Sequence, residues 1–448
     1  MIDYQLLLAV FVGVGLLLIL ILFVRIQAFI SLLIASIVVG LIAGMEPMKI
    51  IQTIQTGMGN TLGFVAVVVG LGSMFGAILE HSGGAEALGK YMLDKFGEKN
   101  ASWALMITGF FVAIPVFFDV AFIILIPIIY SLQRKSGKSL LLYAIPLLAG
   151  LAITHAFIPP TPGPVAVADI LKADLGWVIL FGFIVGVPTA ILSGPVFGKY
   201  IASKIFVNAP EVKEDVLVNG NFPGVGLVLS IIAIPINLIV LNTLLSSPLI
   251  PGDFLSETAR TWIKMIGHPF TALIIANLMA WYFLGIRRGF SREKLFDITT
   301  KSMGPAGVII LLTGAGGVFK EMLVNTGTGE MIANYFASAG ISVLLFAFIA
   351  AALIRIMQGS ATVAMITSAG ITSPLLLSDV TEIDKALLVI AIASGASILS
   401  HVNDSGFWLV SKYLGLNEKE TFKSWTVMTT ILSLVGFITV SLISALFS

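Results

Sequence analysis

Long apolar runs decide what this chain can fold into. Runs of about 20 apolar residues occur near positions 5–24, 27–44, 60–80, 176–198, 222–245, 268–285, 305–324 and 425–447. A helix needs such a run to cross a bilayer, whereas a membrane barrel shows short alternating strands. Since only 11% of the 448 residues are charged, we expect an all-α polytopic membrane protein.

Six other apolar stretches are short or interrupted. Four of them, 102–117, 118–132, 341–356 and 361–374, are too short to cross about 30 Å at 1.5 Å per residue. They are adjacent in pairs, which predicts two re-entrant hairpins. Two longer stretches, 139–172 and 386–413, contain helix breaks, HAFIPPTPGP at 155–164 and SHVNDSG at 400–406. We therefore predict one hairpin and one broken helix in each half of the chain.

The sequence contains an internal repeat. Glycine, phenylalanine and leucine positions of 70–83 recur in 314–327, at a shift of 244 (314 − 70). The break at Thr161 falls on the break at Asp404 at a shift of 243 (404 − 161). This near-constant shift predicts a first half, 1–205, a polar cytoplasmic linker, 206–221, and a second half, 222–448. A re-entrant hairpin enters and leaves the membrane on the same side, so each half crosses the membrane about five times. Because five is odd, the second half has inverted topology relative to the first.

Basic residues predict the orientation. With the N-terminus outside, about 18 Lys and Arg side chains fall on inside loops and about five on outside loops. Both termini are then outside. The first hairpin enters from the cytoplasm and the second from the opposite side.

The breaks predict a site for an anion. Interrupted helices at membrane depth free backbone groups, and each new helix N-terminus carries about half a positive charge. Two breaks and two hairpin tips supply four such ends near the midplane. Candidate substrate-binding residues lie there, and their hydroxyls suit a polyhydroxylated substrate: Thr161, Gly163, Gly359, Ser360, Thr362, Asn403, Ser405 and Gly406. The alternative is a set of kinks with satisfied caps and no ligand.

Ionisable residues inside a membrane are functional candidates by default. Asp119 and Arg355 lie in the two hairpins, where Asp119 could exchange a proton and Arg355 could pair with a substrate carboxylate. A mutual salt bridge between them is the alternative. His155 and His401, at corresponding breaks, could relay a proton or bond freed carbonyls. Asp404 suits a helix cap or a proton carrier better than a ligand contact.

Composition and the remaining motifs exclude other classes. Without cysteine, the chain has no disulfide, thiolate nucleophile or thiolate-bound metal, and a net charge of +1 favours no nucleic acid. The glycines of 70–72 and 314–317 lie inside spans and predict close helix packing rather than nucleotide loops. Residues 83–97 predict an amphipathic helix on the surface. Asp169 and Lys172 are expected to form a solvated pair near the outer mouth. No enzyme, metal or cofactor is expected. No ATPase motif occurs, so a gradient must drive any concentrative transport.

Three segments carry a resemblance to a known family. Residues 114–119 (IPVFFD), 155–164 and 400–408 (SHVNDSGFW) resemble the gluconate permeases, proton symporters for gluconate and related sugar acids. The resemblance implies a bacterial inner-membrane protein, related to an ion-transporter superfamily with inverted repeats, homodimers and elevator movement. By that analogy, 1–59 and 222–304 form a scaffold, and 60–205 and 305–448 carry the hairpins and transport elements.

The resulting hypothesis is import of a sugar acid by proton symport, with the carboxylate between the hairpin tips and the broken helices. Its nearest rival is a sodium-coupled carrier of di- or tricarboxylates, in which freed carbonyls bind Na⁺. An intramembrane aspartyl hydrolase using Asp119 and Asp404 is a remote alternative. A passive channel would not need closing hairpins.

Overall fold

The computed structural model describes residues 4–210, 222–246, 256–327, 342–376, 380–402 and 404–447, and all regular structure in these ranges is helical. Within them, eight segments are long and apolar enough to cross a membrane: Tyr4–Ile21, Pro47–His81, Leu141–Leu171, Leu175–Lys204, Val225–Ser246, Pro269–Arg288, Arg292–Asn325 and Glu418–Leu446. Large apolar side chains on the first and last of these face outward, as at Phe11 and Leu442. The all-α membrane class is confirmed.

Two helices begin earlier than their apolar runs predict. Helix α3 (Pro47–His81) and helix α14 (Arg292–Asn325) each extend about four turns before the runs at 60–80 and 305–324. Pro47 occupies the first turn of α3, and the Ser291 hydroxyl caps α14 by accepting the Lys294 N–H at 3.1 Å. Hydropathy does not predict these first turns because their residues are polar. No residue in them interrupts the helix. By contrast, α2 (Ala28–Ile42) ends short of the predicted 27–44.

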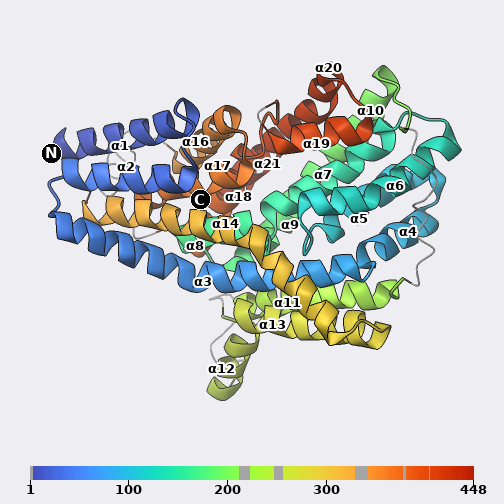
Figure 1. Ribbon diagram of the computed structural model, residues 1–448, viewed down its shortest axis with the longest axis horizontal. Helices are drawn as coiled ribbons and strands as arrows, with labels where there is room; N and C mark the ends of the chain where they lie inside the picture. Colours follow the sequence, from blue (N-terminus) through green and yellow to red (C-terminus); the bar gives the residue numbers. More distant parts are fainter. Residues whose placement is uncertain are drawn as a thin grey trace.

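Helices α3 and α14 run antiparallel side by side through the molecule (Figure 1). Gly57 of α3 lies against Gly317 and Val318 of α14, so closely that a Cβ at Gly57 would lie 2.8 Å from the Val318 Cα. Small residues let helix backbones approach in this way. Close packing is thus confirmed for the 314–317 segment.

The structure has a helix pair at each position where the sequence predicts a hairpin, and an interruption at each predicted break. The first hairpin consists of α5 (Ala101–Val112) and α6 (Phe118–Ser136), and the second of α16 (Val343–Gln358) and α17 (Ala361–Thr372). The first broken helix is α7 (Leu141–Phe157) and α8 (Pro162–Leu171), with a cis Pro159–Pro160 bond between them. The second is α18 (Glu382–Gly395) and α19 (Ser405–Leu414).

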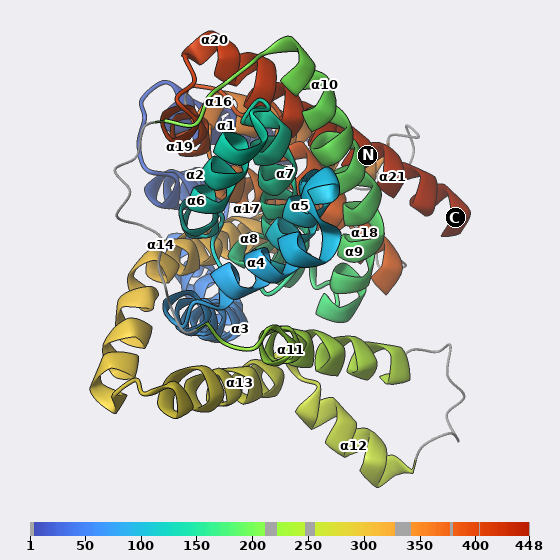
Figure 2. The same cartoon turned by 90° about the vertical axis from the view of Figure 1, so that its right-hand side faces the viewer.

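The same helix pairs pack in each half. Helix α5 packs on α7 as α16 packs on α18, and α9 (Leu175–Ile191) packs on α7 as α21 (Val427–Phe447) packs on α18. The halves also exchange contacts, because α2 lies on α14 while α13 (Pro269–Met279) lies on α3. Figure 2 shows α11 (Val225–Ser246), α12 (Glu257–Ile266) and α13 as a layer beside the bundle. The surface helix expected at 83–97 is α4 (Gly84–Phe96).

Candidate functional site

A cavity of about 600 Å³ lies where the hairpin tips meet the broken helices. Residues from α6, α7, α14, α16, α17, α19, the helical turn before α21, and α21 itself line it. Nine of the predicted site residues line this one cavity: Asp119, His155, Arg355, Gly359, Ser360, Thr362, Asp404, Ser405 and Gly406. Residues up to 287 positions apart (406 − 119) are therefore brought together at the place that the breaks predict.

Three helix N-termini converge on the cavity. Helix α6 begins beside Asp119, α17 beside Ser360 and α19 beside Ser405. Ser360 caps α17, its hydroxyl accepting the Val363 N–H at 3.3 Å. Asp404 caps α19, its Oδ1 accepting the Gly406 N–H at 3.0 Å. At each of these ends the aligned peptide dipoles contribute a positive partial charge, which favours an anion.

A buried ion pair forms one wall. The Arg355 guanidinium bonds the Asp404 carboxylate and the Gly359 carbonyl, with both charged side chains almost fully buried. Asp404 also accepts the Ser400 hydroxyl, which in turn accepts the Trp425 indole N–H at 2.6 Å. The alternative of an Asp119–Arg355 salt bridge is therefore wrong. Arg355 already carries a neutralising partner within the protein.

Asp119 has no such partner. Its side chain is exposed in the cavity, and it makes no hydrogen bond or ion pair with any described residue. An isolated carboxylate in a membrane cavity is costly unless it is hydrated or protonated. Within the described residues, no three carboxylate, imidazole or thiol groups gather to hold a metal ion. Asp119 is thus the one acid of this cavity without a neutralising partner among the described residues.

His155 stands between the cavity and a small adjoining pocket. That pocket, with room for about one water, also contacts Ser73 and Thr161. The buried His155 Nδ1 and Ser73 Oγ have no hydrogen-bond partner among the described residues. The His155 ring packs edge-on to Phe117 at the first hairpin tip, with ring centroids 6.4 Å apart. This position is compatible with proton transfer between the two spaces.

Other predicted site residues lie outside the cavity. Thr161 occupies the position before α8, but its hydroxyl donates to the Ile158 carbonyl at 2.6 Å instead of capping the helix. Gly163 packs on Met365, where an added Cβ would lie 2.6 Å from the Met365 methyl group. His401 Nε2 lies 2.7 Å from the Ile356 carbonyl. Asn403 lies outside the described residues.

The Asp169–Lys172 pair differs from its prediction. Their side chains do pair, at 3.0 Å, but Asp169 is buried rather than solvated. Lys320 of α14 reaches the same helix end and donates to the Ile170 carbonyl at 2.5 Å. This cluster holds α8 against α14, because a cation at a helix C-terminus is favourable.

Several residues that matter here carry no signal in the sequence. Gln358, Trp425 and Thr429 line the cavity, and Ser400 links Trp425 to Asp404. Trp425 lies in a π-helical turn, Phe422–Thr426, that leads into the last span. Only the location of Ser400 beside the second break could have indicated its role.

The first hairpin tip rests directly on α3, which allows a test. A Cβ at Gly76 would lie 1.9 Å from the Pro115 carbonyl oxygen, whereas a Cβ at Gly70 meets nothing within 4 Å. Gly76→Ala should displace the tip and lower the stability of the folded protein by about 1–3 kcal/mol, whereas Gly70→Ala should not lower it. Thermal denaturation of the two variants checks this. Equal behaviour of the two alanine variants would show that the tip is not seated on α3.

Comparisons with known proteins extend the sequence argument. A family profile described as "GntP family permease" matches residues 5–446. A gluconate permease of Pseudomonas aeruginosa is 41% identical over 99% of this chain and 98% of its own length. A low-affinity gluconate transporter and a Gnt-II system L-idonate transporter, both of Escherichia coli, are 41% and 38% identical over at least 95% of each chain.

A solved structure shares the fold. The Alcanivorax borkumensis YdaH transporter superposes with a TM-score of 0.68, covering 92% of this chain and 97% of that one. Only 14% of the residues are identical, so the likeness concerns the fold alone.

Proposed function

The chain belongs to the GntP family of permeases and is a transporter rather than an enzyme, and from that premise we propose that it imports gluconate or a related sugar acid by proton symport. The observation that carries the proposal is the unpaired Asp119 carboxylate in a cavity onto which three helix N-termini open. The aspartyl hydrolase alternative fails, because Asp404 is held by Arg355 and Ser400.

Charge balance couples the proton to the substrate. Arg355 and Asp404 neutralise each other, so an ionised Asp119 leaves the cavity one negative charge that repels the substrate carboxylate. Two like charges about 4 Å apart repel by about 4 kcal/mol at an effective dielectric constant of 20. Protonation of Asp119 removes this repulsion. By linkage, the anion then favours proton binding as strongly as the proton favours the anion.

The polar groups of the cavity suit a hydroxylated carbon chain. Ser360, Thr362 and Ser405 present hydroxyls from two helix N-termini, and Thr362 has no hydrogen-bond partner among the described residues. The relatives named for gluconate and for L-idonate act on sugar acids of this kind. We assign the hydroxyls of Ser360, Thr362 and Ser405, with the backbone at Gly359 and Gly406, to the substrate. The placement of Thr161, Gly163 and His401 outside the cavity makes their contribution indirect.

The architecture supports transport by an inverted-repeat elevator. The antiparallel course of α3 and α14, and the helix pairs that recur in each half, are what inversion of the two halves produces. The proposed scaffold is 1–59 with 222–304, and the moving part holds both hairpins and both broken helices. A homodimer in the inner membrane with both termini outside completes the proposal.

Uptake into proteoliposomes tests the coupling ion. An inward proton gradient should drive accumulation of labelled gluconate, and an inward sodium gradient should not. Accumulation with sodium alone would establish the sodium-coupled rival and leave the site intact. Uptake that equilibrates without accumulation under either gradient would indicate a channel.

Substrate affinity should depend on the hydroxyls of the second hairpin tip. Thr362→Val removes a hydroxyl at nearly constant volume and should raise KM for gluconate about five- to tenfold, since a lost hydrogen bond costs about 1–1.5 kcal/mol. Thr430→Val is the matched control, because the Thr430 hydroxyl bonds the Thr426 carbonyl outside the cavity. An unchanged KM in Thr362→Val would remove Thr362 from the substrate contacts.

A further inference from the structure

A second cavity, of about 680 Å³, lies beside the first. The turn between α1 (Tyr4–Leu22) and α2 forms one side, and α14 with the second hairpin tip forms the other. Gln358 lines both cavities, and its Oε1 accepts the Ser360 N–H at 2.8 Å. The two spaces therefore meet at one side chain, held in place at the hairpin tip.

Arg25 is the one charged residue among the described residues that line this second cavity. The others are apolar or are the amides Gln27 and Gln358. The Arg25 side chain is exposed and makes no hydrogen bond or ion pair within the described part of the chain. A free guanidinium in a largely apolar recess is a strong attractor for a carboxylate, to which it can donate two parallel hydrogen bonds.

The backbone at Arg25 gives an independent reason to assign it a role. Its φ is +60°, in the left-handed region that side chains with a Cβ adopt at a cost. Glycine or asparagine would occupy this turn with less strain. Strained residues gather at functional sites, where the surrounding structure holds the unfavourable conformation. Here the turn directs a cation to the edge of the second cavity.

We propose that Arg25 makes the second cavity a vestibule that binds carboxylate anions before they enter, or after they leave, the central cavity past Gln358. The identity of the anion as a sugar acid rests on the proposed function, but the anion selectivity does not. In the orientation predicted from the basic residues, the α1–α2 turn is on the cytoplasmic side. The vestibule would then receive the substrate when it is released into the cell.

The absence of cysteine from the chain allows a direct test. Met357 lines the vestibule and is 48% exposed, so Met357→Cys introduces a single reactive thiol there. The measurement is the ratio of its reaction rates with an anionic sulfonatoethyl and a cationic trimethylammonioethyl thiosulfonate. Arg25→Gln in this background should lower the ratio of anionic to cationic rate roughly tenfold, and Arg25→Lys should preserve most of it.

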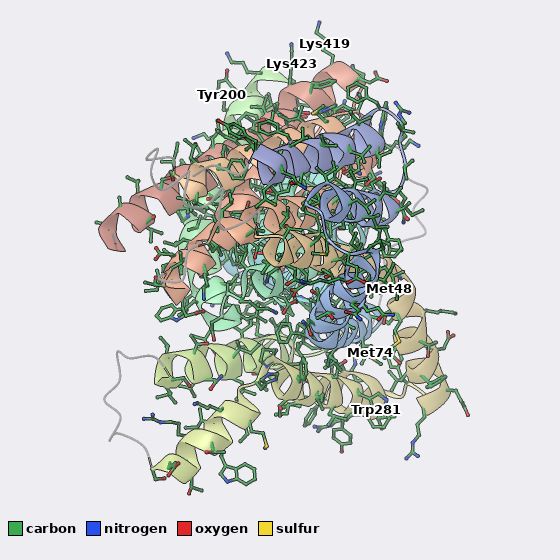
Figure 3. The ribbon with its side chains drawn as sticks, turned by 90° about the vertical axis from the view of Figure 1, so that its left-hand side faces the viewer. Met48, Met74, Tyr200, Trp281, Lys419 and Lys423 are labelled. Atoms are coloured by element: carbon green, nitrogen blue, oxygen red, sulfur yellow. The ribbon has the colours of Figure 1, made fainter. Side chains whose placement is uncertain are left out.

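Two controls keep the result interpretable. The first control is Tyr200→Cys, because α10 (Phe197–Lys204) lies away from the α1–α2 turn (Figure 1). The Tyr200 side chain projects outward at the same end of the molecule as Lys419 and Lys423 (Figure 3). The rate ratio of this variant should not respond to Arg25→Gln. Arg25→Gly relieves the left-handed backbone, so it should fold at least as well as the parent protein while losing the anion preference.

The outcomes separate this proposal from the transport proposal. Thiol labelling needs no substrate, so its result does not depend on what the protein transports. The vestibule proposal is overturned if Arg25→Gln leaves the rate ratio of Met357→Cys unchanged, or if the thiol at position 357 does not react. In gluconate exchange, Arg25→Gln should raise the KM for gluconate that is added on the side of the membrane where the α1–α2 turn lies. The maximal rate should stay unchanged. Absence of any sugar-acid transport by the parent protein would overturn the proposed function, and the labelling result would still decide the vestibule.

Discussion

Asp404→Asn should lower the stability of the folded protein by about 3–5 kcal/mol, because it leaves the buried Arg355 charge without a partner. Transport should be lost as well, since the same carboxylate orders Ser400 and the start of α19. The midpoint of thermal denaturation in detergent and the initial rate of gluconate uptake measure the two effects.

The double variant Arg355→Gln with Asp404→Asn separates charge from shape. Removing both charges takes away the desolvation cost of the pair, so the double variant should regain at least half of the lost stability. Transport should stay absent, because the wall of the cavity has changed. If the double variant is as unstable as the sum of the single variants, the two residues do not interact energetically.

Asp119→Asn should abolish accumulation driven by a proton gradient and leave exchange intact. The amide removes the negative charge permanently, so the anion binds without a proton. An inward gradient of one pH unit can sustain about tenfold accumulation for one proton per anion, since one pH unit corresponds to about 1.4 kcal/mol. For Asp119→Asn, the ratio of internal to external gluconate should fall to about one.

Counterflow of labelled gluconate is the necessary companion measurement. Asp119→Asn should exchange internal for external gluconate at a rate close to that of the parent protein, which shows that the protein folds and moves. Asp94→Asn, in the amphipathic helix α4, serves as the control acid. Gradient-driven accumulation by Asp119→Asn would transfer the coupling role to His155 or Asp404.

The positions of the breaks follow from local chemistry, which is why the sequence predicts them well. Proline removes a backbone donor and fixes φ, so the interruption at 158–161 is decided within a few residues. The convergence of hairpin tips and breaks is also expected from the predicted repeat. Polar helical turns such as 47–59 escape hydropathy, because their partners lie in other parts of the chain.

Side-chain pairing was less predictable. Arg355 and Asp404 lie 49 positions apart (404 − 355), and whether Arg355 reaches Asp404 or Asp119 depends on how a hairpin docks against a break. Thr161 fits the sequence rule for a helix cap, yet its hydroxyl finds the nearer Ile158 carbonyl. Threonine hydroxyls have such competing local acceptors, so residue type alone does not decide their direction.

Although matching helix pairs pack in the two halves, the acids lie at different positions in each. At an offset of 243, Asp119 of the first hairpin corresponds to Thr362 of the second (362 − 119), and Thr161 of the first break corresponds to Asp404 of the second (404 − 161). A strictly symmetric chain would hold two acids at equivalent positions, and these would bind their protons in two coupled steps. Here Asp404 is paired with Arg355, whereas Asp119 has no ion-pair partner among the described residues. In the proposed mechanism, this single unpaired acid corresponds to one proton for each anion carried.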